Sequence, residues 1–168
     1  MNLLTGKLNG FAYSANCGWI SLSNAFAFVQ TDVIAAGGDL DGDGMADAWE
    51  RLHLPGGTNA LPGTDGDGDG HSNVQEYWAD TDPVVTGDVL EITVLDGVTT
   101  GAPSSVTWDS ELTRVYEVQK GTNLIFPVWT DSGLGTVAPD GAFTTRAFAD
   151  TNAPAGFYRV RAKRPLAP

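Results

Sequence analysis

Alternating hydrophobic and polar positions in the C-terminal half of the chain predict a series of β-strands. The clearest run is 89–95, where Leu90, Ile92 and Val94 fall on one face, as in a half-buried strand. Further strands are predicted at 105–108, 113–120, 128–130, 142–148 and 157–162. Turn signals between them are typical of a sandwich or an open barrel. We therefore predict a β-sandwich-like domain over 84–168.

Short apolar runs also predict strands in an N-terminal β-segment, residues 1–38. Turn signals stand at 9–10 and 16–18, and strands are expected at 19–22 and 25–29. A sheet this small cannot bury its own face. We therefore expect it to pack on the C-terminal domain or to pair with another copy of the chain.

Between these two parts, over 39–83, acidic residues alternate with glycine. A twelve-residue pattern occurs twice, at 39–50 and 65–76, with oxygen-bearing side chains at positions 1, 3, 5, 9 and 12 and glycine at position 6. This is the spacing of a Ca²⁺ loop, in which position 7 contributes its backbone carbonyl. The predicted ligands are Asp39, Asp41, Asp43, Met45, Asp47 and Glu50 in the first loop and Asp65, Asp67, Asp69, His71, Asn73 and Glu76 in the second. Tandem calcium-binding loops with two Ca²⁺ sites are therefore predicted over 39–83.

The chemistry of these ligands favours calcium over other metals. Ca²⁺ accepts six to eight oxygen ligands in a flexible shell, whereas Mg²⁺ demands a small octahedral cage. Zinc prefers nitrogen and sulfur, and every predicted ligand atom here is oxygen.

A short helix is predicted after each loop. Trp49 and Leu52 fall on one face of the first helix, and Val74, Tyr77 and Trp78 on one face of the second. No amphipathic helix is predicted before either loop, unlike in a regulatory EF-hand. Loop position 8, usually β-branched, is occupied by alanine in the first loop and serine in the second. Calcium that stabilises structure is therefore expected, rather than a calcium-driven switch.

The charge distribution limits the classes of partner. The net charge is −12, and residues 39–82 contain eleven acidic residues and one basic residue. Nucleic acid is therefore excluded as a partner, because its phosphates would be repelled. No apolar run is long enough for a membrane span. Since no signal peptide is recognisable, a secreted protein would have lost its leader or be a fragment. The single cysteine, Cys17, is expected to be buried or to form an intermolecular bond.

The two acidic loops resemble the thrombospondin type 3-like, EF-hand-like calcium repeats of bacterial secreted and surface proteins. The resemblance rests on 39–50 and 65–77, continuing to 80–83, and dockerin repeats are more distant relatives. The segments 10–22 and 156–160 also resemble sequences that flank such repeats. The resemblance implies a structural, calcium-binding protein located outside a bacterial cell or on its surface.

Two functions follow as hypotheses, and neither is enzymatic, because no nucleophile, base and orienting group cluster in the sequence. The first is an extracellular calcium-binding structural protein that forms surface assemblies or filaments with copies of itself or with other surface proteins. The second is a carbohydrate-binding or anchoring module of a larger secreted enzyme, with Trp108, Tyr116 and Trp129 stacking on a polysaccharide. The alternative for these three rings, which we favour, is that they belong to the core of the sandwich.

Overall fold

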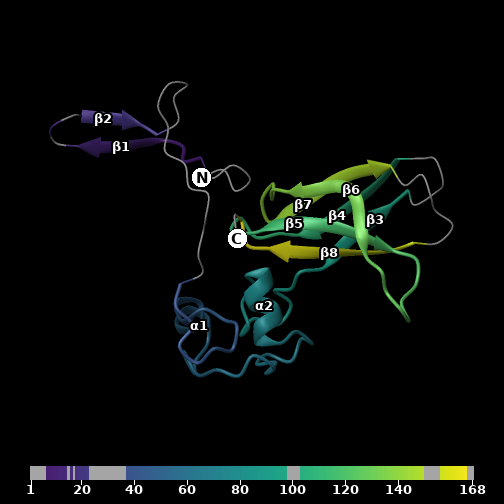
Figure 1. Ribbon diagram of the computed structural model, residues 1–168, viewed down its shortest axis with the longest axis horizontal. Helices are drawn as coiled ribbons and strands as arrows, with labels where there is room; N and C mark the ends of the chain where they lie inside the picture. The colour runs from purple at the N-terminus through teal and green to yellow at the C-terminus, as the bar shows by residue number, and fades with distance from the viewer. Residues whose placement is uncertain are drawn as a thin grey trace.

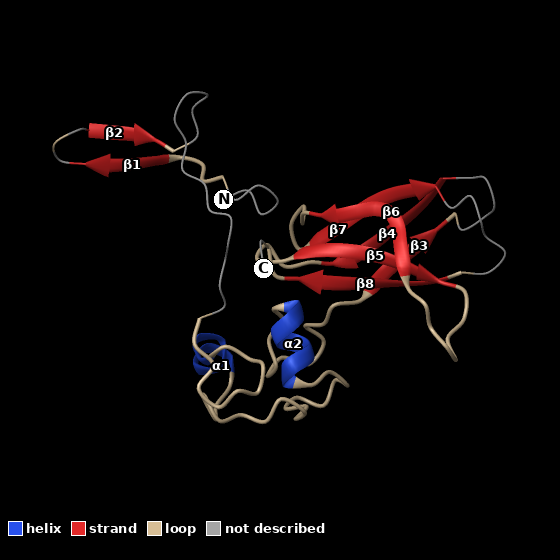
Figure 2. Ribbon diagram, in the orientation of Figure 1, coloured by secondary structure: helices blue, strands red, loops and turns tan. Residues whose placement is uncertain are grey.

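The computed structural model describes residues 7–14, 16, 18–22, 37–97, 103–149 and 156–165. Within these residues the chain is mainly β, with eight strands in three sheets and two short helices, as predicted (Figure 2). Figure 1 shows three parts in chain order: a hairpin, a loop-rich middle with both helices, and a β-sandwich. The predicted strand at 25–29 and the predicted environment of Cys17 lie outside the described residues.

The N-terminal part is a hairpin of β1 (Phe11–Ser14) and β2 (Gly18–Ser21), paired antiparallel. The turn is therefore the second of the two predicted turn signals. The other predicted turn signal, at Asn9 and Gly10, lies just before β1, and the residues 1–6 that would form a strand before it lie outside the described residues. The Gly10 carbonyl accepts a hydrogen bond from Leu22 N at 3.0 Å, which closes the open end of the hairpin.

The hairpin does not bury its described aromatic side chains against the sandwich. Phe11 is 69% exposed and Tyr13 is 66% exposed. Figure 1 places β1 and β2 away from the sheets of the C-terminal part. For these two side chains, the expected packing on the C-terminal domain is contradicted.

Each predicted helix is present and begins at position 9 of its loop. Helix α1 spans Asp47–His53 and helix α2 spans Asn73–Ala79. The predicted buried face is only partly correct, since Leu52 is 78% exposed and Trp78 is 43% exposed. The buried stripe of each helix instead runs through the loop glutamate and the aromatic residue beside it.

The middle part has a small hydrophobic core of its own. Its buried members are Met45, Ala46, Trp49, Leu54 and Tyr77. The rings of Trp49 and Tyr77 meet edge to face at 5.3 Å, which brings α1 and α2 together. Both loops are therefore anchored on one shared cluster of side chains.

Two three-stranded antiparallel sheets form the C-terminal part. The first has the order β3-β4-β7 and contains β3 (Ile92–Asp96), β4 (Pro103–Asp109) and β7 (Phe143–Ala149). The second has the order β6-β5-β8 and contains β5 (Val115–Gly121), β6 (Thr130–Val137) and β8 (Phe157–Lys163). The core between them consists of Val106, Trp108, Tyr116, Val118, Val137, Phe148 and Ala162. Because both sheets contribute to one core, this part is a β-sandwich.

Strand β6 departs most from the sequence prediction. The predicted strand at 128–130 overlaps β6 only at Thr130. Gly133 and Gly135 have φ values of +99° and +61°, and the pairing with β5 shifts register there. This irregular strand contains few apolar residues, so hydrophobic alternation could not locate it.

Candidate metal centre

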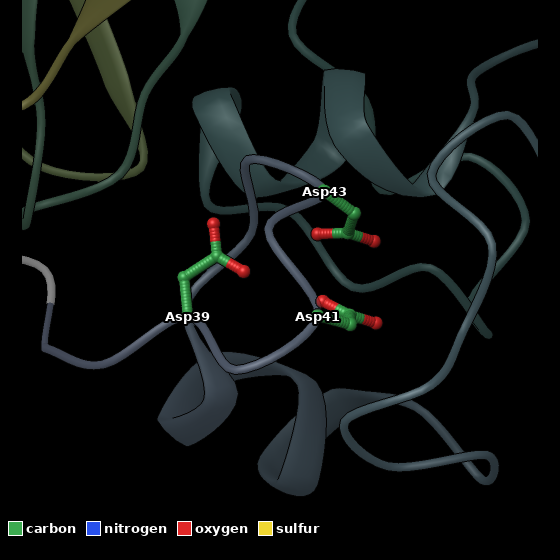
Figure 3. Close-up of side chains that lie close together, drawn as sticks. All are labelled: Asp39, Asp41 and Asp43. Carbon is green, nitrogen blue, oxygen red and sulfur yellow. The ribbon is translucent and has the colours of Figure 1, made fainter.

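Three aspartates in each loop bring their carboxylates together. One oxygen from each of Asp39, Asp41 and Asp43 lies within 4.8 Å of the others, and Asp65, Asp67 and Asp69 form an equivalent group in the second loop. Figure 3 shows the side chains of Asp39, Asp41 and Asp43 lying close together on the first loop. Such clusters are compatible with a metal ion, since unpaired carboxylates this close would repel one another.

The same hydrogen bonds fold the backbone of both loops. In the first loop, Asp39 accepts from Gly42 N at 2.8 Å and from Gly44 N at 3.1 Å. In the second, Asp65 accepts from Gly68 N at 2.8 Å and from Gly70 N at 3.0 Å. Position 5 then accepts from the amide of position 7 at 2.9 Å in each loop. The sequence repeat is therefore a structural repeat.

Glycine is required at position 4 as well as at position 6. Gly42 and Gly68 have φ values of +73° and +80°, and Gly44 and Gly70 have values of +95° and +98°. These are left-handed conformations that cost an L-residue roughly 1–2 kcal/mol. Glycine at position 4 is repeated in the sequence of both loops, so it is a signal additional to the position-6 glycine from which the loops were predicted.

The position-12 glutamates are the most informative side chains of the site. Glu50 is 0% exposed and Glu76 is 2% exposed. All four of their carboxylate oxygens are buried without a hydrogen-bond partner among the described residues. A buried carboxylate is costly unless it is paired with a cation or hydrogen-bonded.

The pKa values of these glutamates reflect the same environment. Burial, reinforced by the nearby carboxylates of Asp67 and Asp69, raises the pKa of Glu76 to about 7. Burial likewise raises the pKa of Glu50, with a further contribution from Asp43. The backbone amide of Ala60, which donates to Gly57 O at 3.1 Å, acts in the opposite direction and lowers the pKa of Glu50. Each glutamate is thus held among like charges, where a cation would favour its charged form.

Position 9 differs between the two loops. In the first, Asp47 Oδ1 accepts from Leu40 N at 2.9 Å, and Oδ2 lies 3.4 Å from Arg51 Nη2. In the second, Asn73 Nδ2 donates to Leu61 O at 2.9 Å, and its Oδ1 is buried without a partner in the described part of the chain. Asn73 therefore presents an oxygen that could bind a metal ion. Both carboxylate oxygens of Asp47 already contact residues of the first loop or of α1.

At position 7 the predicted ligand is a backbone carbonyl in both loops. The side chain of Met45 is fully buried in the core of the middle part. The side chain of His71 lies beside the loop, with Nδ1 3.3 Å from Asp69 Oδ1. Neither side chain belongs to the aspartate group of its loop, and the two carbonyl ligands remain predictions.

The second loop and α2 are fastened to the sandwich by a buried arginine that our sequence analysis missed. Arg114, which lies just before β5, is 7% exposed. It donates to Tyr77 O at 2.7 Å and to Trp78 O at 2.9 Å, and it lies 3.2 Å from Asp80. It therefore satisfies carbonyls at the C-terminal end of α2, which lack partners within the helix.

The proposed polysaccharide platform is not formed. Trp108 is 0% exposed and Tyr116 is 1% exposed, since both belong to the sandwich core. Trp129 is half-buried, and the guanidinium of Arg159 lies over its ring at 4.4 Å. Because two of the three aromatic rings are inaccessible, the prediction of a shared stacking surface is wrong.

No family model matches the chain, and no similar protein was found among curated proteins or among solved structures. No helix in the described part of the chain is long and apolar enough to cross a membrane. The function is therefore inferred from the geometry of the loops and their surroundings.

Proposed function

We propose that the protein is an extracellular, calcium-binding structural component of a bacterial surface. In this proposal two Ca²⁺ ions rigidify the link between the N-terminal hairpin and the sandwich. The observation that carries the proposal is the pair of buried glutamates, Glu50 and Glu76, whose four carboxylate oxygens lack partners in the described residues. Each lies in a loop that also gathers three aspartates.

The ligand set supports calcium as the metal. Three aspartates, one carbonyl, the position-9 side chain and a bidentate glutamate would give about seven oxygens, within the six to eight that Ca²⁺ takes. With free calcium at about 100 times its dissociation constant, each site would add about 2.7 kcal/mol to stability. Weak sites would therefore suffice where calcium is millimolar, which supports a location outside the cell.

The surroundings of the loops support a structural role over a switch. The described residues between α1 and the second loop contain no helix, so the second loop lacks the entering helix of a calcium sensor. Helix α2 is also held at its C-terminal end by the buried Arg114. Opening a groove would require these buried hydrogen bonds to break, which is costly. We therefore propose that calcium holds one arrangement of the chain.

The test is calcium titration calorimetry combined with thermal unfolding of Glu50→Gln and Glu76→Gln. Each variant is expected to lose one binding site and a large part of the thermal stabilisation by calcium, because the closing carboxylate becomes a neutral amide. In chelator each variant should be as stable as the unaltered protein or more so, since like-charge repulsion falls.

Glu91→Gln is the matched control, because Glu91 is exposed and lies outside both loops. It should bind two calcium ions with unchanged affinity. Identical unfolding temperatures for the unaltered protein in calcium and in chelator would contradict the proposal. Magnesium at the same concentration should give little stabilisation, because the loops are large and flexible for that ion.

A further inference from the structure

One end of the sandwich is occupied by the calcium-loop part of the same chain. Arg164, just after β8, donates to the Tyr77 hydroxyl at 3.0 Å, and its guanidinium lies 4.9 Å from the Trp78 ring centre. Strand β8 spans Phe157–Lys163 and leads away from this contact. At about 3.3 Å per residue, its first residue lies some 20 Å away, at the opposite end of the sheet.

At that opposite end the protein exposes an apolar surface. It is formed by the β5–β6 loop, and we call it the apolar tip; its members are Leu124 (56% exposed), Ile125 (81%), Phe126 (78%) and Val128 (74%). Gly121 pairs with Phe157, which fixes the base of this loop at the start of β8. Asn123 Oδ1 accepts from Ile125 N at 2.8 Å and from Phe126 N at 3.3 Å, so the tip has a defined turn.

At the other extreme of the chain, the hairpin β1–β2 also exposes aromatic side chains, with Phe11 at 69% and Tyr13 at 66%. The two strands of this hairpin have four residues each, so they bury little apolar surface of their own. Docking of its apolar face would therefore stabilise the hairpin as well as the contact. Figure 1 shows the hairpin at the left of the view and the β5–β6 loop at the right, at the far end of the sandwich.

The charge distribution indicates which surfaces of two copies can meet. Residues 39–82 have a net charge of −10, from eleven acidic residues and one basic residue. Residues 1–38 contain only Lys7 and Asp32 as charged residues, so their net charge is zero. Two acidic middle parts would repel each other. A contact between the hairpin of one copy and the apolar tip of another keeps the two acidic middle parts apart.

An alternative contact between copies, joining the acidic middle to the basic last strand, is less suitable. Arg159 donates to Gln119 at 2.9 Å and Lys163 donates to Glu117 at 2.8 Å, so both are engaged within the chain. Strand addition at β6 is also disfavoured, because the register shift and the left-handed glycines Gly133 and Gly135 interrupt its regular backbone. The apolar side chains therefore remain as the better surface for a second copy.

We propose that the hairpin of one copy docks on the apolar tip of the next, giving a head-to-tail assembly. The contact is heterologous, since it joins two different surfaces, and it extends into a filament unless it closes into a ring. This inference rests on the proposed structural function and names its partner as a second copy of the chain. The surfaces are small, so assembly is expected at concentrations on the order of micromolar or above.

The first test is sedimentation velocity of the whole chain in calcium over a concentration series. The unaltered protein should form species larger than a monomer as its concentration rises. Ile125→Asp should weaken this self-association at least about tenfold, because a charge would be buried at the contact. Leu112→Asp is the control: Leu112 is 65% exposed but lies beside Arg114, at the calcium-loop end of the sandwich. It should assemble normally.

The second test is complementation between two defective variants. Phe11→Asp disrupts the docking surface of the hairpin and leaves the apolar tip intact. Ile125→Asp disrupts the apolar tip and leaves the hairpin intact. Alone, each should remain monomeric. Mixed, they should form a dimer and nothing longer, because one hairpin and one tip remain competent. If the mixture stays monomeric while the unaltered protein assembles, the contact is not hairpin to tip and the proposal is wrong.

The remaining outcomes are equally decisive. A calcium-loaded protein that is monomeric at every concentration overturns the proposal, even if titration shows two bound calcium ions and the calcium sites stand. Assembly without calcium binding would overturn the proposed metal sites and leave the docking contact intact. Neutral phosphatidylcholine vesicles probe a lipid surface instead: vesicle binding that Ile125→Asp abolishes, with self-association unchanged, would assign the tip to lipid and overturn the contact.

Discussion

In the proposed calcium sites, individual residues of the loops would meet two separate requirements, one for the metal and one for the backbone. The aspartates and glutamates supply oxygen atoms, whereas glycine at positions 4 and 6 allows the chain to curl around them. Asp39 serves both needs, because its carboxylate accepts two backbone hydrogen bonds and also belongs to the aspartate group. A substitution can therefore damage the site without removing any ligand.

The position-4 glycines provide a direct test of the backbone requirement. Gly42→Ala and Gly68→Ala should each lower stability by about 1 kcal/mol, because a Cβ disfavours the left-handed conformation. A Cβ there would meet nothing within 4 Å, so crowding does not contribute. The loss of stability is measured as the difference in free energy of unfolding between each variant and the unaltered protein, from urea unfolding in the presence of calcium.

Gly63→Ala is the matched control for these glycines. A Cβ at Gly63 would also meet nothing within 4 Å, and Gly63 does not have a left-handed φ. It should be neutral or slightly stabilising. Equal effects at Gly63 and Gly42 would show that the left-handed conformation is not the cause.

Among the secondary-structure elements, helix α2 joins the second loop to the sandwich. Its first residue, Asn73, and its fourth, Glu76, are predicted metal ligands. Its C-terminal carbonyls, at Tyr77 and Trp78, accept hydrogen bonds from Arg114. A helix of seven residues is too short to be stable alone. Its stability must come from the loop at one end and the arginine at the other.

Arg114→Lys should therefore destabilise the protein by about 2 kcal/mol. A lysine ammonium cannot reproduce the planar fork that reaches two carbonyls, and at least one buried carbonyl would lose its partner. Burial already lowers the pKa of Arg114, which means that the site disfavours a positive charge. The charged guanidinium is therefore stable there only because the two carbonyls and Asp80 pair with it. Urea unfolding followed by tryptophan fluorescence measures the loss.

Arg146→Lys is the control for this prediction. Arg146 forms a salt bridge with Asp140 and also donates to Ala138 O at 3.0 Å and to Thr145 O at 2.7 Å, but its side chain is 30% exposed, so water can replace these contacts. Exposed pairs contribute roughly 0–1 kcal/mol, so the substitution should cost less than about 1 kcal/mol. A loss at Arg114 no larger than at Arg146 would mean that α2 is not held by the arginine.

Across the whole molecule, stability is unevenly distributed. The sandwich core draws residues from both sheets, and Val106, Trp108 and Val118 are completely buried. The calcium-loop part has a smaller core and carries a net charge of −10 over residues 39–82. Removal of the metal should therefore loosen one part of the molecule before the other.

Hydrogen exchange in chelator should reveal this difference. Amides over 39–83 should exchange at least about tenfold faster than in calcium, because clustered carboxylates repel and the buried glutamates lose their counter-ion. Amides of β4 and β5 should keep most of their protection. Mass spectrometry of the exchanged peptides gives both rates. Equal acceleration throughout the chain would show that the two parts unfold as one unit.

The sequence was sufficient to predict much of this protein because the relevant signals are local. Hydrophobic alternation located five of the six sandwich strands, and the acidic repeat located both loops and both helices. The predicted ligand positions rest on spacing alone, since a tight loop places alternate side chains toward its centre. Strand β6 was missed, because left-handed glycines and a register shift interrupt the alternation on which strand prediction depends.

Tertiary structure decided which side chains are accessible and which are held by distant partners. Trp108 and Tyr116 could equally have faced a ligand or a core, and only the packing of two sheets placed them inside. Arg114 carries no local signal, because its partners lie 36 and 37 residues earlier in the chain. Burial and long-range hydrogen bonds depend on the chain's path in space, which spacing along a sequence does not specify.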